Sequence, residues 1–136
     1  MNQLSLTHRV VGADEVKERM NSQEIILFIA EDGNNIVGTA TVCFLWKPDG
    51  KTLAEIHDVV VDEQSRGQKI GTHLIEEVVR CVKERVIKTN RSIKILFTSR
   101  PKNIAANIMY QKMGFELAAK ANGESGTNLY RLTVKP

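Results

Sequence analysis

The stretch that decides the fold runs from Leu53 to Thr72 and reads LAEIHDVVVDEQSRGQKIGT. Its first part, Leu53 to Val61, is hydrophobic and predicts a central strand whose last residues, Val59, Val60 and Val61, are buried on both faces. The loop that follows consists of Arg66, Gly67, Gln68, Lys69, Ile70, Gly71 and Thr72. Its glycines let backbone N–H groups approach an anion, a helix beginning at Gly71 or Thr72 adds its dipole, and two basic side chains add charge. The segment therefore predicts a cradle for a pyrophosphate.

Two other nucleotide-binding motifs are absent from the sequence. It has no Gly-Lys-Ser/Thr sequence for a P-loop and no Gly-x-Gly-x-x-Gly sequence for a dinucleotide fold. The remaining alternative for this loop is a glycine-containing turn between strand and helix that binds no ligand.

The rest of the chain predicts strands, then a strand-helix-strand crossover. From Gly71 the hydrophobic period changes to about 3.6, which predicts a helix packed on a sheet. Pro101 and Gly114 mark the start and stop of a second helix, and a short amphipathic helix is predicted over Ala13 to Met20. The predicted strands are Leu4 to Val10, Glu24 to Ala30, Ile36 to Trp46, Leu53 to Val61, Ser92 to Thr98, Phe115 to Ala118 and Asn128 to Val134. This order predicts one α/β (α+β) domain over residues 1–136, with a mixed central sheet of about six to seven strands and helices on both faces.

Composition narrows the functional classes. The chain has 136 residues, a net charge of +3 and no apolar stretch long enough to span a bilayer, so a single soluble, cytoplasmic domain with an anionic ligand is expected. Many basic residues lie between Arg80 and Lys102, and they fit a solvated face, a positive rim that attracts phosphates or, third, a nucleic-acid surface. Nucleic acid is disfavoured because no aromatic residues alternate with these charges. Cys43 and Cys81 have no metal-ligand spacing and are expected to be reduced thiols in or near the core.

The second helix carries polar residues at a helical spacing. Asn103, Asn107 and Tyr110 are spaced i, i+4 and i+7, which predicts one shared face, while Ile104, Ile108 and Met109 are expected to point toward the body of the protein. Two amides and a phenol on one face could pair with the amide groups and the sulfur end of a pantetheine arm. The alternative is a solvated polar face on which Tyr110 is a half-buried packing residue.

The glycine loop and this helix, in this order, resemble the core of the GNAT superfamily of acetyl-CoA-dependent N-acetyltransferases. The superfamily's loop pattern, Gln/Arg-x-x-Gly-x-Gly/Ala, aligns with Arg66 to Gly71, and Lys69 stands where the first glycine is usual. The resemblance covers Leu53 to Ala118, and the later segments look like those of small bacterial members without assigned acceptors. It implies acetyl-CoA as the acetyl donor, no metal, and splayed central strands that form the acyl-CoA cleft. It also implies that Asn103 binds the pantetheine arm and that Tyr110 protonates the departing thiolate.

The general base is left open between two residues. Glu55 aligns with the position of the base in GNAT histone acetyltransferases, whose Ala-Glu-Ile segment recurs as Ala54 to Ile56. His57 shares a strand face with Glu55 by alternation, and Asp58 points the other way unless a bulge intervenes. Glu55 is favoured and His57 follows closely. A backbone N–H near Val59 to Val61 is expected to stabilise the oxyanion.

The sequence therefore predicts transfer of an acetyl group from acetyl-CoA to a primary amine of a small molecule or a protein, by direct attack through a tetrahedral intermediate. The alternative is a GNAT-fold acyl-CoA-binding regulatory protein without turnover. The acceptor, the acyl-chain preference and the formation of a homodimer are left open.

Overall fold

The computed structural model describes residues 4–10, 23–47, 49–67, 69–123 and 126–136, the first seven of these and Gln23 by their backbone alone. The strands are β1 (Leu4–Val10), β2 (Gln23–Asp32), β3 (Asn35–Trp46), β4 (Thr52–Val61), β5 (Ile93–Ser99), β6 (Glu116–Ala119) and β7 (Asn128–Val134). The helices are the short 3-10 helix η1 (Glu63–Ser65) and the α-helices α2 (Ile70–Thr89) and α3 (Ile104–Lys112). The helix expected over Ala13 to Met20 lies outside the described residues.

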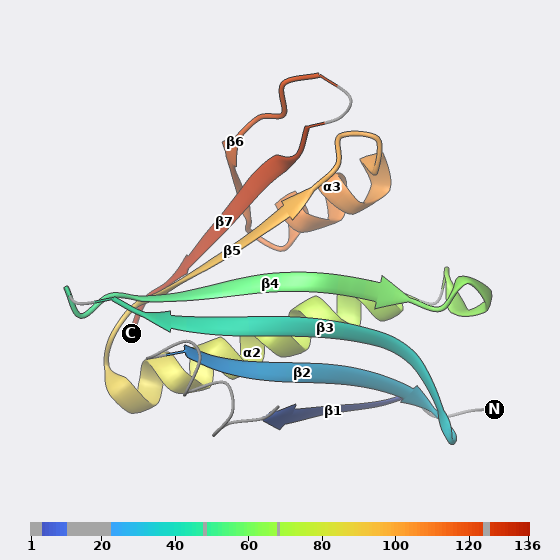
Figure 1. Ribbon diagram of the computed structural model, residues 1–136, viewed down its shortest axis with the longest axis horizontal. Coiled ribbons are helices and arrows are strands. Elements are labelled where there is room, and N and C mark those ends of the chain that lie inside the picture. Colours follow the sequence, from blue (N-terminus) through green and yellow to red (C-terminus); the bar gives the residue numbers. More distant parts are fainter. Residues whose placement is uncertain (1–3, 11–22, 48, 68, 124–125) are drawn as a thin grey trace.

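The strands form one mixed sheet in the order β1-β2-β3-β4-β5-β7-β6 (Figure 1). Strands β1 to β4 pair antiparallel in sequence, β4 pairs with β5 in parallel, and β7 pairs antiparallel with both β5 and β6. The parallel pair needs a long connection, which α2 supplies. The expected mixed sheet is thus confirmed, with seven strands in the described residues.

Helix α2 closes the core over β2, β3 and β4. The stripe read from the sequence is buried as expected, with Leu74, Ile75, Val78 and Val82 at 0% exposure and Val86 at 1%. Gly38 on β3 permits this close approach, because a Cβ there would lie 2.9 Å from Cγ2 of Ile70. On the other end of the helix, Arg85 forms a bidentate ion pair with Glu24 and lies 4.0 Å from the centroid of the Phe44 ring.

The sheet splits between β4 and β5. The two strands pair only from Thr52 with Ile93 to Glu55 with Leu96, after which β4 continues beside β3 and β5 continues beside β7. Figure 1 shows the two strands together at one end and apart at the other, as the two arms of a V. The expected splayed strands are therefore present.

The split corrects the prediction that Val59, Val60 and Val61 are buried on both faces. Val60 is 58% exposed and the other two are half-buried, because beyond Glu55 the strand has lost its neighbour on one side. Their β-branched side chains fit a strand, but the sequence does not show that the sheet opens beside them.

A bulge interrupts β4 at the split. Thr41 pairs with His57 and Thr39 with Val60, so two residues of β4, Asp58 and Val59, lie opposite one residue of β3. Asp58 has a φ of 52°, a left-handed conformation that is rare for a residue with a side chain. The bulge turns Asp58 from the face that simple alternation gives it, so that His57 and Asp58 are both exposed.

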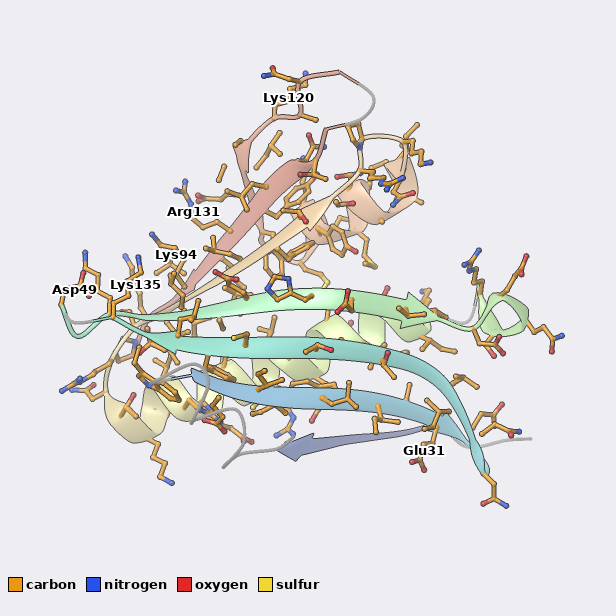
Figure 2. All side chains as sticks on the ribbon, viewed as in Figure 1. Glu31, Asp49, Lys94, Lys120, Arg131 and Lys135 are labelled. Atoms are coloured by element: carbon orange, nitrogen blue, oxygen red, sulfur yellow. The ribbon has the colours of Figure 1, made fainter. Side chains whose placement is uncertain are left out.

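Two of the basic residues between Arg80 and Lys102 are bound by carboxylates. Arg80 is bound by Glu77 and Glu84, and Arg85 by Glu24. Lys94 lies toward the closed end of the V, near Lys135 (Figure 2). These positions fit the solvated-face interpretation better than a single rim.

Within the described ranges, no helix is long and apolar enough to cross a membrane. No group of three or more His, Cys, Asp and Glu side chains among the described residues could hold a metal ion. Cys43 is half-buried and Cys81 is buried, and both are free thiols.

Candidate active site

A cavity of about 680 Å³ lies in the open end of the V. It is lined by Val59, Val60, Val61, Arg66, Gly67, Lys69, Ile70, Gly71, Thr72, Asn103, Ala105, Ala106, Met109 and Tyr110. The glycine loop, the end of β4 and one side of α3 thus meet around one space. Most of the residues predicted to bind the cofactor are brought together here, and Gln68 lies outside the described residues.

The loop brings the amino terminus of α2 to this cavity. Gly67 has a φ of +90° and Lys69 a φ of 58°, both in the left-handed region, just before α2 begins at Ile70. Among the described residues, the N–H of His73 donates a hydrogen bond to the carbonyl of Lys69, at 3.0 Å. The helix has no side-chain cap bond and no acidic residue in its first turn. The backbone N–H groups of a helix start, the positive end of the helix dipole and a first turn without carboxylates suit a phosphate group.

Helix α3 forms the opposite wall. Ala105 and Ala106 have small side chains that leave room beside the loop, and the Met109 sulfur accepts a hydrogen bond from the Thr72 hydroxyl. Ala105, Ala106 and Met109 were not among the predicted cofactor-binding residues, because their side chains do not by themselves indicate a cofactor. Their place in the helix between Asn103 and Tyr110 is the only signal that could have found them.

Asn107 does not line this cavity, contrary to the shared face predicted for it. Its amide nitrogen donates to the carbonyls of Arg100 and Asn103, at 3.0 and 2.6 Å. Its Oδ1 accepts hydrogen bonds from the Tyr130 hydroxyl and from the Asn128 amide. Asn107 therefore anchors the start of α3 to β7.

The prediction for the apolar residues of this helix is wrong for two of them. Ile104 is 68% exposed and Ile108 is 49% exposed, and both lie on the side of the helix that faces away from the cavity. A turn of 100° per residue explains the error, because it puts Asn107 closer to Ile104 than to Met109 around the helix.

Tyr110 lies beside the aromatic side chains of Phe97 on β5 and Tyr130 on β7. Its ring centroid is 4.4 Å from that of Phe97, in an edge-on arrangement, and 5.6 Å from that of Tyr130. Burial, and then the proximity of Tyr130, raise the pKa of the Tyr110 phenol above its ordinary value. The phenol is therefore protonated at neutral pH, as a proton donor must be.

A second, smaller cavity of about 380 Å³ adjoins the first between β4 and β5. Its lining includes His57, Asp58, Ser99, Arg100 and Thr127. Val59, Asn103 and Tyr110 line both cavities. Two ligands, one in each cavity, would therefore meet beside Tyr110.

The two candidate bases form a pair on β4. Nε2 of His57 lies 3.0 Å from Oε2 of Glu55, and the side chains are 54% and 34% exposed. His57 lines the smaller cavity and Glu55 does not. The arrangement puts the imidazole at the cavity and the carboxylate behind it.

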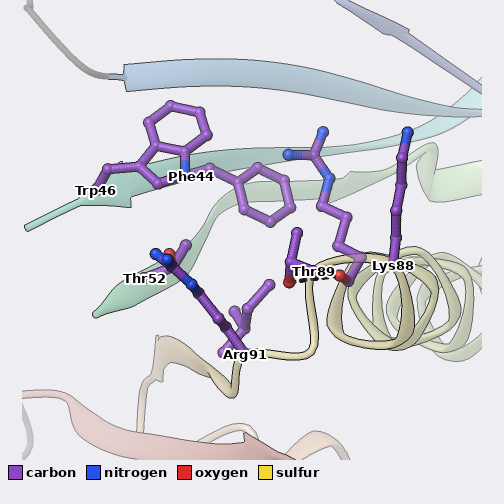
Figure 3. A pocket seen from close by; sticks show the side chains of 8 residues that line it. Phe44, Trp46, Thr52, Lys88, Thr89 and Arg91 are labelled. Atoms are coloured by element: carbon purple, nitrogen blue, oxygen red, sulfur yellow. Dashed lines mark hydrogen bonds between the residues drawn. The ribbon is translucent and has the colours of Figure 1, made fainter. Parts of the chain in front are cut away.

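A third cavity, of about 660 Å³, lies at the other end of α2 (Figure 3). Its basic side chains are Arg85, Lys88 and Arg91, and Trp46 lies across from them. The carboxyl end of the helix points its free carbonyls and negative dipole here, which disfavours an anion. Arg85 is also already bound to Glu24. The glycine-loop cavity is the better phosphate site.

Comparison with known protein families identifies the family to which this chain belongs. The Acetyltransferase (GNAT) family model matches residues 6–115, most of the chain. The chain belongs to the GNAT acetyltransferase family. It is therefore an acetyltransferase by family, and the fold predicted from the loop and the second helix is confirmed.

Solved GNAT structures have the same fold at low sequence identity. Arabidopsis thaliana NAA60 in complex with a bisubstrate analogue has a TM-score of 0.68 at 15% identity, covering 96% of this chain and 98% of that chain. Arabidopsis thaliana Naa50 in complex with the bisubstrate analogue CoA-Ac-MVNAL has a TM-score of 0.65 at 20% identity, covering 78% and 71%. A GNAT acetyltransferase from Staphylococcus aureus Mu50 has a TM-score of 0.63 at 18% identity, covering 98% and 100%.

Proposed function

We propose that the protein transfers an acetyl group from acetyl-CoA to a primary amine, with the cofactor in the larger cavity and the acceptor in the smaller one. One observation carries the proposal: the two cavities share Val59, Asn103 and Tyr110. The larger cavity has the helix amino terminus that suits a pyrophosphate, and the smaller has the imidazole and carboxylate that suit an amine. Solved GNAT relatives hold acetyl-CoA or bisubstrate analogues, which supports the same use here.

The loop would hold the pyrophosphate through the N–H groups of Ile70, Gly71 and Thr72, with Arg66 and Lys69 adding charge. Asn103, on the border of both cavities, would bind the pantetheine arm. On the side away from β3, no described strand pairs with β4 beyond Glu55, and a backbone N–H there, near Val59 to Val61, would hold the thioester oxygen. When bound, acetyl-CoA supplies the activated acetyl group.

His57 would act as the base, and Glu55 would orient its ring and stabilise the imidazolium. An amine such as that of lysine has a pKa of about 10.4 and is mostly protonated at neutral pH, so a positioned base raises the reactive fraction. His57 would take one proton from the ammonium group, and the neutral nitrogen would then use its lone pair to form the bond to the carbonyl carbon. The second proton that the nitrogen loses after bonding would pass to water. Electrons from the C=O bond move to the oxygen, which the β4 N–H stabilises in the tetrahedral intermediate. The electrons on the oxygen would then re-form the C=O bond as the C–S bond breaks, and sulfur would keep that bond's electron pair and take a proton from Tyr110.

The test is a mass-spectrometric screen of acetyl-CoA with pooled amines, which include amino acids, polyamines, aminoglycosides, amino sugars and lysine peptides. A product heavier by one acetyl group, formed only with active protein, supports the proposal. Acetyl-CoA binding without any product across the pools favours the regulatory alternative, since a non-catalytic acyl-CoA-binding protein would bind without turnover.

A further inference from the structure

The smaller cavity is the size of a small molecule. Its volume of about 380 Å³ lies near the lower end of ligand sites, which run from about 300 to 1,000 Å³. Phe97 and Tyr110 form an aromatic floor, and Thr98, Ser99 and Thr127 add polar groups around it. A compact polar acceptor fits this space better than a long or bulky one.

One wall of the cavity is acidic because of the bulge in β4. The left-handed backbone at Asp58 brings two successive side chains, His57 and Asp58, to the same cavity. In a regular strand they would point to opposite faces. The wall therefore has a carboxylate beside the His57 and Glu55 pair, which suits a cationic amine.

The other wall carries one positive charge. Arg100 follows the last residue of β5, and its backbone carbonyl accepts hydrogen bonds from the N–H of Asn103 at 3.1 Å and from the Asn107 amide at 3.0 Å. These bonds fix the backbone of Arg100, which is one of the residues that line the cavity. A guanidinium can bind a carboxylate through two parallel hydrogen bonds.

The two charges do not neutralise each other. Among the described residues, neither Asp58 nor Arg100 forms an ion pair, although both line the same small cavity. Opposite charges that face one cavity without pairing leave both free for a ligand that carries both signs.

We propose that the acceptor is a free amino acid or a close analogue, a small molecule with an amine and a carboxylate a few bonds apart. The inference rests on the proposed function and narrows it to a substrate class. Arg100 binds the carboxylate, and Asp58 attracts the ammonium group toward His57. The amine then lies at the side of the cavity that Val59 and Tyr110 share with the cofactor cavity. A peptide amino terminus has the amine but carries an amide where a free amino acid has its carboxylate.

The experiment compares each amino acid with its own carboxamide and with the amine that lacks the carboxyl group. The full chain is used with acetyl-CoA, and kcat/KM is measured for each member of the set. Loss of a charge-assisted bidentate contact should lower kcat/KM by about tenfold or more, so the acid should exceed its amide by that factor. In Arg100→Gln the ratio of acid to amide should fall toward one. Lys102→Gln is the matched control, because it removes one exposed charge that lies outside both cavities, and it should keep the wild-type ratio.

The outcomes separate the two proposals. Acetylation of amides, amines or short peptides as well as or better than free amino acids overturns the substrate class and leaves the transferase function standing. A strong preference for the acid that Arg100→Gln does not change also overturns the inference, because the carboxylate then binds elsewhere. Acetyl-CoA binding with no acetylation of any member or of the wider amine pools refutes the proposed function, and the substrate class with it.

Discussion

The buried hydroxyl of Tyr130 donates a hydrogen bond to Oδ1 of Asn107, and this bond ties the last strand to α3. Tyr130 is 1% exposed, so its hydroxyl has little access to water. The amide of the same asparagine donates to the carbonyl of Asn103, the residue before α3, and to that of Arg100, which follows β5. One side chain thus holds the wall that carries Asn103 and Tyr110 in place.

Because of this bond, substitution of Asn107 should affect stability, whereas substitution of Asn103 should affect acetyl-CoA binding. Asn107→Ala leaves the Tyr130 hydroxyl buried without an acceptor and should lower the free energy of unfolding by about 1–3 kcal/mol. Asn103→Ala should change it by less than about 0.5 kcal/mol, because the exposed Asn103 side chain makes no cap bond. The Asn103 variant should instead bind acetyl-CoA more weakly. Urea denaturation and calorimetry measure both quantities.

A double-mutant cycle provides the control. Tyr130→Phe removes the hydroxyl, so Asn107→Ala should cost less in that background than in the wild type. Equal costs in the two backgrounds would show that the bond does not anchor the helix.

Replacement of Lys69 by glycine should stabilise the fold. The Lys69 φ of 58° is left-handed, which costs a residue with a side chain about 1–2 kcal/mol, whereas glycine adopts it freely. After the extra chain entropy of glycine, about 0.5–1 kcal/mol, Lys69→Gly should stabilise the fold by up to about 1 kcal/mol. Asn90, with a φ of 56°, is the comparison: Asn90→Gly should gain less, because asparagine tolerates this conformation. Thermal denaturation that gives Lys69→Gly a lower midpoint than the wild type would contradict the expectation.

Tyr110→Phe isolates the proton donor. It keeps the ring packing against Phe97, should spare acetyl-CoA affinity, and should lower turnover on the order of 10²-fold. The measurement uses an acceptor found in the screen, under conditions where the chemical step limits the rate. Wild-type turnover in this variant would remove Tyr110 from the mechanism.

The raised pKa of Tyr110 also predicts how the stability of the fold depends on pH. The phenol ionises at a higher pH in the folded protein than its ordinary value of 10.0. Its contribution to stability is therefore complete below the ordinary value and is lost as the pH rises through the folded pKa. Above pH 10 the wild type should lose stability more steeply than Tyr110→Phe, and parallel stability curves would contradict the burial argument.

Substitutions of His57 and Glu55, the two candidate bases on β4, should lower turnover most clearly at neutral pH. His57→Gln should lower turnover more than Glu55→Gln, because the imidazole lines the acceptor cavity and the carboxylate lies behind it. Both losses should shrink at alkaline pH, where the solution supplies the neutral amine directly. Losses of equal size across the pH range would exclude a role for the pair in proton removal, and a larger loss in Glu55→Gln would make Glu55 the base.

The parts of the fold that depend on local sequence could be predicted. The bounds of β1 and β7, the buried stripe of α2 and the glycine loop follow from alternation, helical period and turn residues close together in the chain. The bulge at Asp58 could not, because it depends on pairing with β3. The structural role of Asn107 depends on Asn128 and Tyr130, 21 and 23 residues away. The exposure of Val60 depends on where β5 leaves the sheet.

The binding of acetyl-CoA in the glycine-loop cavity tests the central claim most directly. A Cβ on Gly71 would lie 3.7 Å from Cγ2 of Val61, an ordinary contact, whereas one on Gly38 would meet Ile70 at 2.9 Å. Gly71→Val should therefore fold but fill the cavity, while Gly38→Ala should lose stability. Calorimetry is the measurement: the wild type should bind acetyl-CoA saturably, and folded Gly71→Val should show no binding. No binding by the wild type, or unchanged affinity in the folded variant, would contradict the account.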